Sequence, residues 1–260
     1  MQTMQKNALT LTLTTGVAGI FGAFLRWLQN MNAFESDTGL LIPGKTSTAV
    51  FLIYALIAAA LFVLIAFFWT KRVGASAEQG AALSAHTRIP GIMTKLCGAV
   101  TLVCSLAVIF ASGGARFALL ERIFAVCGVL AAAALALLFA KNVTTAKNRG
   151  LSFVVLVLFS CLWLISSYKA NSENPVVWSF AVEILAIGAI ILAWYELAAY
   201  CYGRAKPKRA LLFIQLAAFL SITTLSDSRS MAMQLIFAVE AAAMLMFEFL
   251  LVENMWDVRE

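Results

Sequence analysis

Long apolar runs alternate with short polar segments along the whole chain. Eight runs approach the roughly 20 mostly apolar residues that a helix needs to cross a bilayer. They cover residues 8–28, 48–69, 92–111, 118–140, 151–168, 176–202, 209–225 and 231–252. No run has the alternation typical of strands, and an open sheet would leave backbone groups unsatisfied in lipid. The pattern therefore predicts an all-α fold, a polytopic membrane helical bundle of about eight transmembrane helices.

The polar segments divide these runs into helical hairpins within a single transmembrane domain, 1–260. The hairpins cover residues 1–70, 92–140, 151–202 and 209–252. The connection 71–91 is rich in Gly, Ala and Ser, and we interpret it as a flexible cytoplasmic linker. The first run resembles a signal peptide, but it ends in Phe-Leu-Arg-Trp at 24–27. That segment is typical of an interfacial anchor and not of a cleavage site, so we expect a retained helix.

The charges support this architecture and predict its orientation. Only 12% of the 260 residues are charged, against about 25% in soluble domains. The net charge is +6. The basic residues gather in the loops after the second, fourth and sixth apolar runs. These residues are Lys71, Arg72, Arg88, Lys141, Lys147, Arg149, Arg204, Lys206, Lys208 and Arg209. The asymmetry predicts that both termini are cytoplasmic. We expect the basic loops to contact anionic lipid and not nucleic acid.

A short motif indicates an internal repeat of hairpins. Phe-Ala-Val-Glu at 180–183 recurs at 237–240, which is 57 residues later, and the same spacing aligns Glu196 with Glu253. A third copy, Phe-Ala-Val-Cys, stands at 124–127. Membrane segments use few residue types, so chance is the alternative explanation. The matching glutamates favour a parallel hairpin repeat, related by an axis along the membrane normal.

Two glutamates lie within predicted spans and are the first candidates for function. Counted from the expected helix starts, Glu183 lies about 10 Å and Glu240 about 13 Å into the membrane. A charged acid facing lipid at that depth is costly, so each must face the bundle interior, pair, or stay protonated. One hypothesis is a proton or cation site shared by two equivalent helices. The other is a pair of protonated side chains that hold the bundle together.

No basic partner is evident at that depth, and one adjacent pair offers two alternatives. Glu121 and Arg122 begin the fourth predicted helix. Arg122 either extends its long side chain to the membrane surface or turns inward as the partner of Glu183 or Glu240.

Further polar residues extend the candidate set. Glu248 follows Glu240 by eight residues, about 80° round a helix, so the two side chains lie broadly on one face. Together they would mark a polar path toward the cytoplasm. Gln215, Gln234 and Glu121 are candidates for hydrogen bonds between helices.

The residue types leave no catalytic set. His86 is the one histidine, which argues against paired-histidine haem, a Ser–His hydrolase and a multi-histidine zinc site. The five cysteines, at 97, 104, 127, 161 and 201, lie in or beside apolar runs and suit buried apolar positions. Trp194, Tyr195, Tyr200 and Tyr202 suggest an interfacial aromatic belt. We expect no enzyme activity, no cofactor and no metal site.

Two functions fit these observations. The first is a small transporter or channel for a solute or ion in which Glu183 and Glu240 respond to protons or cations. The second is a non-catalytic membrane subunit, scaffold or sensor that binds a protein partner, in a homo-oligomer or a membrane complex. Short loops and the absence of targeting segments suggest a bacterial inner membrane.

Overall fold

A computed structural model describes residues 2–35, 38–71, 83, 88–111, 118–140, 146–172, 174 and 176–256. Within these residues the chain forms eight α-helices and one short 3-10 helix. The elements are α1 (Gln2–Asn32), α2 (Thr46–Lys71), α3 (Ile89–Ala111), α4 (Ala118–Leu137), α5 (Ala146–Ala170), η2 (Val177–Ser179), α6 (Ala181–Cys201), α7 (Pro207–Thr224) and α8 (Met231–Trp256). The all-α prediction is confirmed for this part of the chain.

Most of these helices have the length and composition of membrane spans. In the described residues six are long and apolar enough to cross a membrane, namely α1, α2, α3, α5, α6 and α8. The apolar part of α4 is shorter, Arg122–Leu137. α7 begins with Pro207, Lys208 and Arg209 and holds Gln215, which lowers its hydropathy. The chain is therefore a multi-pass membrane protein built of helices.

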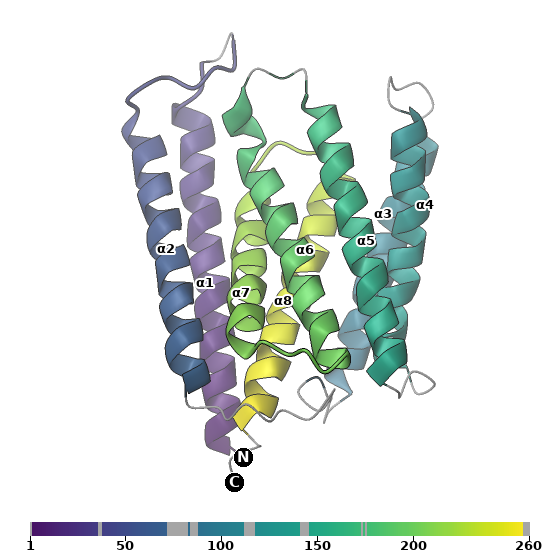
Figure 1. Ribbon diagram of the computed structural model, residues 1–260. Coiled ribbons are helices and arrows are strands. Elements are labelled where there is room, and N and C mark those ends of the chain that lie inside the picture. The colour runs from purple at the N-terminus through teal and green to yellow at the C-terminus, as the bar shows by residue number, and fades with distance from the viewer. Residues whose placement is uncertain are drawn as a thin grey trace.

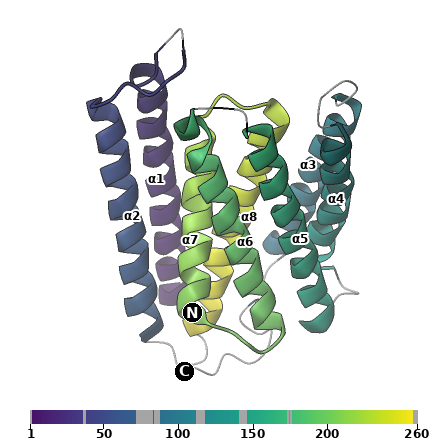
Figure 2. The ribbon, with the colours of Figure 1, turned by 45° about the horizontal axis from the view of Figure 1, so that its top comes forward.

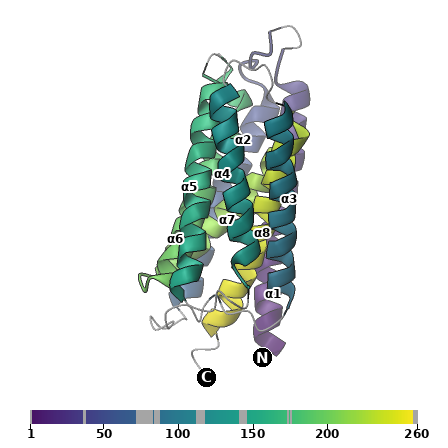
Figure 3. The same ribbon diagram turned by 90° about the vertical axis from the view of Figure 1, so that its right-hand side faces the viewer.

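The helices form a ring with one hairpin packed outside it. Successive helices from α3 to α8 contact one another, and α8 returns to contact α3. α1 packs on α7 and α8, and α2 packs on α1 and α7 (Figures 1 and 2). α1 begins and α8 ends at one end of the bundle, seen from the side in Figure 3. We call this the terminal end, and the opposite end, where α7 connects to α8, the distal end.

Large aromatic side chains fill the interior of the ring. Phe247 of α8 lies 5.5 Å from Phe153 of α5 and 5.6 Å from Trp194 of α6, measured between ring centroids. Trp163 of α5 meets Phe237 of α8 at 4.5 Å. All five side chains are buried. Aromatic pairs in these geometries add to the burial energy, so they hold opposite sides of the ring together.

This packing corrects the expected aromatic belt. Trp194 and Tyr200 are buried in the core, whereas Tyr195 and Tyr202 are exposed. The four residues extend over about two turns, from within α6 to its C-terminal cap residue Tyr202, so their side chains point in different directions. Only the two exposed tyrosines remain free to lie at a membrane surface.

Glycines let α1 approach α7 closely. A Cβ atom at Gly19 would lie 2.8 Å from the side chain of Ile222, and one at Gly22 would lie 2.7 Å from Thr223 Oγ1. Any larger residue would therefore push the two helices apart, as at other interfaces of membrane helices that use small residues. α1 is also longer than the expected 8–28, and its last turns reach the polar distal end.

The start of α6 differs from the expected residue 176. A 3-10 turn, Val177–Ser179, precedes the α-helix, which begins at Ala181. Asn174 Oδ1 accepts a hydrogen bond from the Val176 amide at 2.9 Å, and Ser179 Oγ donates to the Val176 carbonyl at 2.8 Å. These side chains satisfy backbone groups that a helix would otherwise use. Glu183 therefore lies in the first turn of α6 and nearer the distal end than expected.

Candidate functional site

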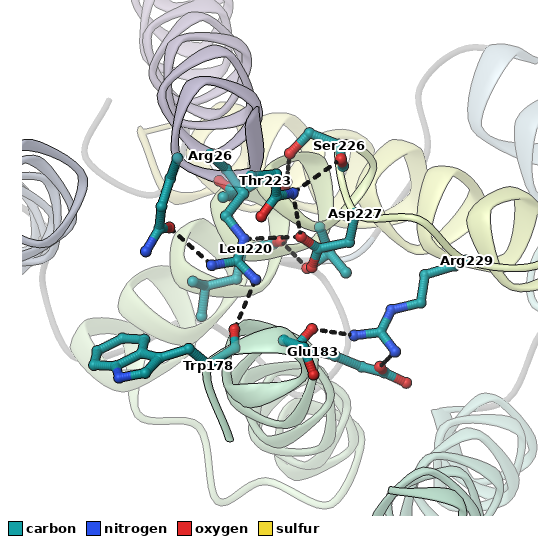
Figure 4. A network of polar contacts seen from close by, with 12 residues as sticks. Arg26, Trp178, Glu183, Leu220, Thr223, Ser226, Asp227 and Arg229 are labelled. Carbon is teal, nitrogen blue, oxygen red and sulfur yellow. Dashed lines mark hydrogen bonds and ion pairs between the residues drawn. The ribbon is translucent and has the colours of Figure 1, made fainter. Parts of the chain in front are cut away.

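Arg26 of α1 is the centre of a polar network at the distal end (Figure 4). Its side chain is fully buried, at 0% exposure. Nε donates to Asp227 Oδ1, Nη1 to Gln29 Oε1 and Nη2 to the Trp178 carbonyl, each at 2.8 Å. Arg26 is therefore not part of an interfacial anchor, whereas Phe24 and Trp27 of the same segment are exposed. The guanidinium points into the protein because it finds a charged partner and two further acceptors there.

Asp227 receives this guanidinium in the turn between α7 and α8. Its carboxylate also accepts a hydrogen bond from Asn30 Nδ2 at 3.0 Å, and its side chain is 4% exposed. The turn that carries it is held by the bond from the Asp227 amide to the Thr224 carbonyl at 3.0 Å. Gln234 Nε2 donates to the Asp227 carbonyl at 3.1 Å. The Arg26–Asp227 pair thus fastens α1 to the α7–α8 turn.

A second, partly buried pair joins the same turn to α6. Arg229 Nη1 lies 2.7 Å from Glu183 Oε2, and Arg229 Nη2 donates to the Ser179 carbonyl at 2.8 Å. Ser167 of α5 donates to Glu183 Oε1 at 2.6 Å. Glu183 therefore has a basic partner that the sequence did not reveal. Arg122, the partner considered above, has an exposed side chain on α4.

A pocket of about 340 Å³ opens beside these ion pairs. Its lining is Arg26, Asn30, Phe34, Asn171, Asn174, Ser179, Asp227, Ser228 and Arg229. The volume lies at the small end of the range for ligand pockets, which is roughly 300–1,000 Å³. Arginine, aspartate and amide groups offer both donors and acceptors, so the lining suits a small polar molecule.

Glu240 lies away from this network. It is in the interior of the ring formed by helices α3 to α8, where the aromatic side chains pack. It is buried on α8, and Trp194 Nε1 donates to its Oε2 at 3.0 Å. The same indole packs against the rings of Phe153 and Phe247, so the carboxyl group lies beside the aromatic cluster. The structure does not bring Glu183 and Glu240 together, because the first pairs with Arg229 and the second with Trp194.

Glu248 occupies a third place, at the junction of α8 with α1 and α7. Gln215 Nε2 and Thr15 Oγ1 both donate to its Oε1, at 2.8 and 2.9 Å. Its partners come from α7 and α1, whereas the partner of Glu240 comes from α6, so the two glutamates do not share one polar cluster. The side chain of Glu121 lies outside the described part of the chain.

The remaining expected residues are found nearer the terminal end or fall outside the described residues. Glu196 pairs with Arg209 at 2.8 Å, and Glu253 accepts a hydrogen bond from Gln5 at 3.0 Å. An apolar groove of about 1010 Å³ between α1, α3 and α8 reaches Glu253. Neither this groove nor the distal pocket is lined by Glu183, Glu240 or Glu248. His86 and most of the linker 71–91 are not among the described residues.

The sequence contains one signal of this network, which hydropathy alone does not register. Gln29 and Asn30 follow Arg26 at the spacings that place side chains on one helix face. A polar face at the end of an apolar helix is compatible with a buried contact to another helix as well as with exposure at the membrane surface. Asp227 and Arg229 have no such signal, because they stand in a short polar turn typical of exposed loops.

No protein-family model matches this chain, and no curated protein or solved structure matches it. Among the described residues, no group of three or more His, Cys, Asp or Glu side chains could hold a metal ion. Fold and site together define a multi-pass membrane protein of helices with buried glutamates and a charged pocket at one end.

Proposed function

We propose that the protein is a small carrier that binds a polar solute in the distal pocket. The observation that supports this most is the lining of the pocket, in which the buried Arg26 and Asp227 lie beside Arg229. Ionisable residues inside a membrane protein are expensive and mark solute or ion paths more often than not. A pocket lined by ionisable residues at the distal end of the bundle is suited to bind a solute.

The two ion pairs supply a physical link between binding and movement. Arg26–Asp227 joins α1 to the α7–α8 turn, and Arg229–Glu183 joins that turn to α6. A solute with an acidic group competes with the carboxylates for the arginines, and this competition favours a state in which the helices separate. In this proposal Glu183 responds through its partner Arg229, which lines the pocket, and Glu240 is the proton- or cation-responsive group deeper in the ring.

The proposal includes a membrane topology. All eight helices cross the membrane as four hairpins, in which α7 is enclosed by α1, α2, α6 and α8, and α4 faces the lipid with exposed side chains such as Val126 and Leu130. The terminal end faces the cytoplasm of a bacterial inner membrane, where the basic loops meet anionic lipid. The distal pocket then opens to the outside. The three hairpins of the ring correspond to the proposed parallel repeat.

A non-catalytic membrane subunit is the second candidate, and one observation favours it. Aromatic side chains fill the ring around Glu240, and neither described pocket reaches that residue. A bundle packed in this way could serve as a rigid scaffold for a protein partner or for a second copy of the chain. In both proposals the protein has no enzyme activity.

Transport by reconstituted protein separates the two candidates. Proteoliposomes would contain a pH-sensitive dye and receive labelled amino acids, carboxylates or sugars. The carrier proposal expects solute uptake or proton flux with wild type, and a loss of about tenfold or more in the Glu183→Gln/Glu240→Gln variant. The exposed Arg122→Gln is the matched control, and each variant is checked for folding by size exclusion. Flux that is absent, or equal in all three proteins, contradicts the carrier, and a co-purifying partner supports the subunit.

A further inference from the structure

The junction of α1, α7 and α8 holds a carboxyl group that the proposed function does not use. Glu248 is fully buried, at 0% exposure, and so is Gln215. Glu248 Oε1 accepts the bonds from Gln215 Nε2 and Thr15 Oγ1. One oxygen of the carboxyl group therefore takes both hydrogen bonds, although the group has two.

The other oxygen atoms at this junction lack partners. Glu248 Oε2 and Gln215 Oε1 are both buried, and neither has a hydrogen bond within the described residues. Both would be pure acceptors if Glu248 were ionised. Buried polar atoms nearly always have a hydrogen-bond partner, and leaving one without a partner is costly. Glu248 and Gln215 are already joined by one hydrogen bond, and each has an acceptor oxygen without a partner. This arrangement indicates that a hydrogen-bond donor is needed between the two oxygens.

We propose that Glu248 binds a proton on Oε2 and donates it in a hydrogen bond to Gln215 Oε1. A carboxylic acid and a carboxamide are planar groups of the same shape, and in one plane they form two hydrogen bonds side by side. The bond from Gln215 Nε2 to Glu248 Oε1 is the first, and the acidic O–H supplies the second. One proton thus satisfies both unpartnered oxygens. Binding takes this proton from water, and release returns it there.

The basic side chains of α1 and α7 are exposed or contact other residues. None of them therefore neutralises the negative charge that an ionised Glu248 would carry. Lys6 of α1 is exposed, and Arg26 pairs with Asp227. On α7, Lys208 lies over the ring of Phe67 at 4.7 Å and Arg209 pairs with Glu196.

The acids of α8 are also engaged elsewhere. Glu240 accepts from Trp194, and Glu253 accepts from Gln5. In the described residues of α1, α7 and α8, the groups that contact the Glu248 carboxyl are thus neutral. A neutral surrounding suits the protonated acid and disfavours the carboxylate.

The proton site would control how the outer hairpin docks on the ring. Thr15 connects α1 to Glu248, and the acid–amide pair connects α8 to α7. With the proton bound, each polar group at the junction has a partner. Without it, a negative charge faces the carbonyl oxygen of Gln215 and weakens the contact among the three helices. This inference does not depend on transport, and it stands if the distal pocket carries no solute.

Infrared spectroscopy of the purified full chain tests the proposal directly. A protonated carboxyl group has a C=O stretch above the amide region that moves in D2O, and a carboxylate has none. Wild type minus Glu248→Gln is expected to contain one such carboxylic-acid band of single-residue amplitude. Glu240→Gln is the control and should keep that band. The amide in Glu248→Gln can make the same two bonds to Gln215, so this variant is expected to fold.

A second variant tests the acid–amide pair itself. Gln215→Leu keeps Glu248 but removes the acceptor of its proton, so the carboxylic-acid band should move to higher frequency. A Glu248→Gln difference spectrum that contains only carboxylate bands overturns the proton site. A band that Gln215→Leu leaves in place overturns the pairing with Gln215.

Discussion

Replacing Arg26 with methionine should destabilise the protein more than any other single charge change in the described residues. The substitution keeps much of the aliphatic volume but removes the cation from a fully buried position. Asp227 then loses its ion pair while its side chain stays 4% exposed, and it keeps the hydrogen bond from Asn30. Gln29 Oε1 and the Trp178 carbonyl lose their donor as well. Breaking a buried pair in this way costs about 3–5 kcal/mol.

A double-mutant cycle measures this interaction. Unfolding in mixed micelles, followed by tryptophan fluorescence, gives the free energy for Arg26→Met, Asp227→Leu and the double variant. The double variant should recover at least about 2 kcal/mol of the summed losses, because it leaves no unpaired charge. Arg122→Met, on an exposed arginine, is the control and should change stability by less than about 0.5 kcal/mol. Additive losses, or a small effect of Arg26→Met alone, would refute the buried pair.

Three other substitutions test the packing of the ring and of its outer hairpin by the same unfolding measurement. Gly22→Leu should cost about 1–3 kcal/mol by overpacking, because its Cβ meets Thr223 Oγ1 at 2.7 Å; no loss would mean that α1 does not dock as described. Trp194→Phe should cost about 1–3 kcal/mol by removing the N–H donor to Glu240, and Glu240→Leu in the same chain should restore part of it. Phe247→Ala should cost about 3–5 kcal/mol by opening a cavity among the aromatic rings, and a loss below 1 kcal/mol would argue against a packed interior.

The helices could be predicted from the sequence because the bilayer imposes a length and an apolar composition on each span. The six spanning helices and the all-α fold follow from that constraint alone. Their ends were harder to predict. α6 starts at Ala181 because Asn174 and Ser179 form local hydrogen bonds with the backbone, and hydropathy does not register such bonds.

The site was less accessible to sequence reasoning, for two physical reasons. Arg26 and Asp227 are 201 residues apart, so no local pattern pairs them, and each alone resembles a surface residue. Trp194 and Tyr195 are neighbours of similar character, yet one is buried and the other exposed. In an apolar helix both the protein and the lipid accept such side chains, so composition does not indicate which face turns inward.

Blocking the distal pocket tests the carrier proposal most directly. Ser228 is exposed and lines the pocket, so Ser228→Trp would fill that space while leaving Arg26, Asp227, Arg229 and Glu183 themselves unchanged. Ser172, exposed in the α5–α6 connection and outside the lining, gives the matched control Ser172→Trp. The account predicts that Ser228→Trp abolishes solute uptake into proteoliposomes while Ser172→Trp keeps the wild-type rate. Equal uptake by both variants would contradict the claim that this pocket receives the solute.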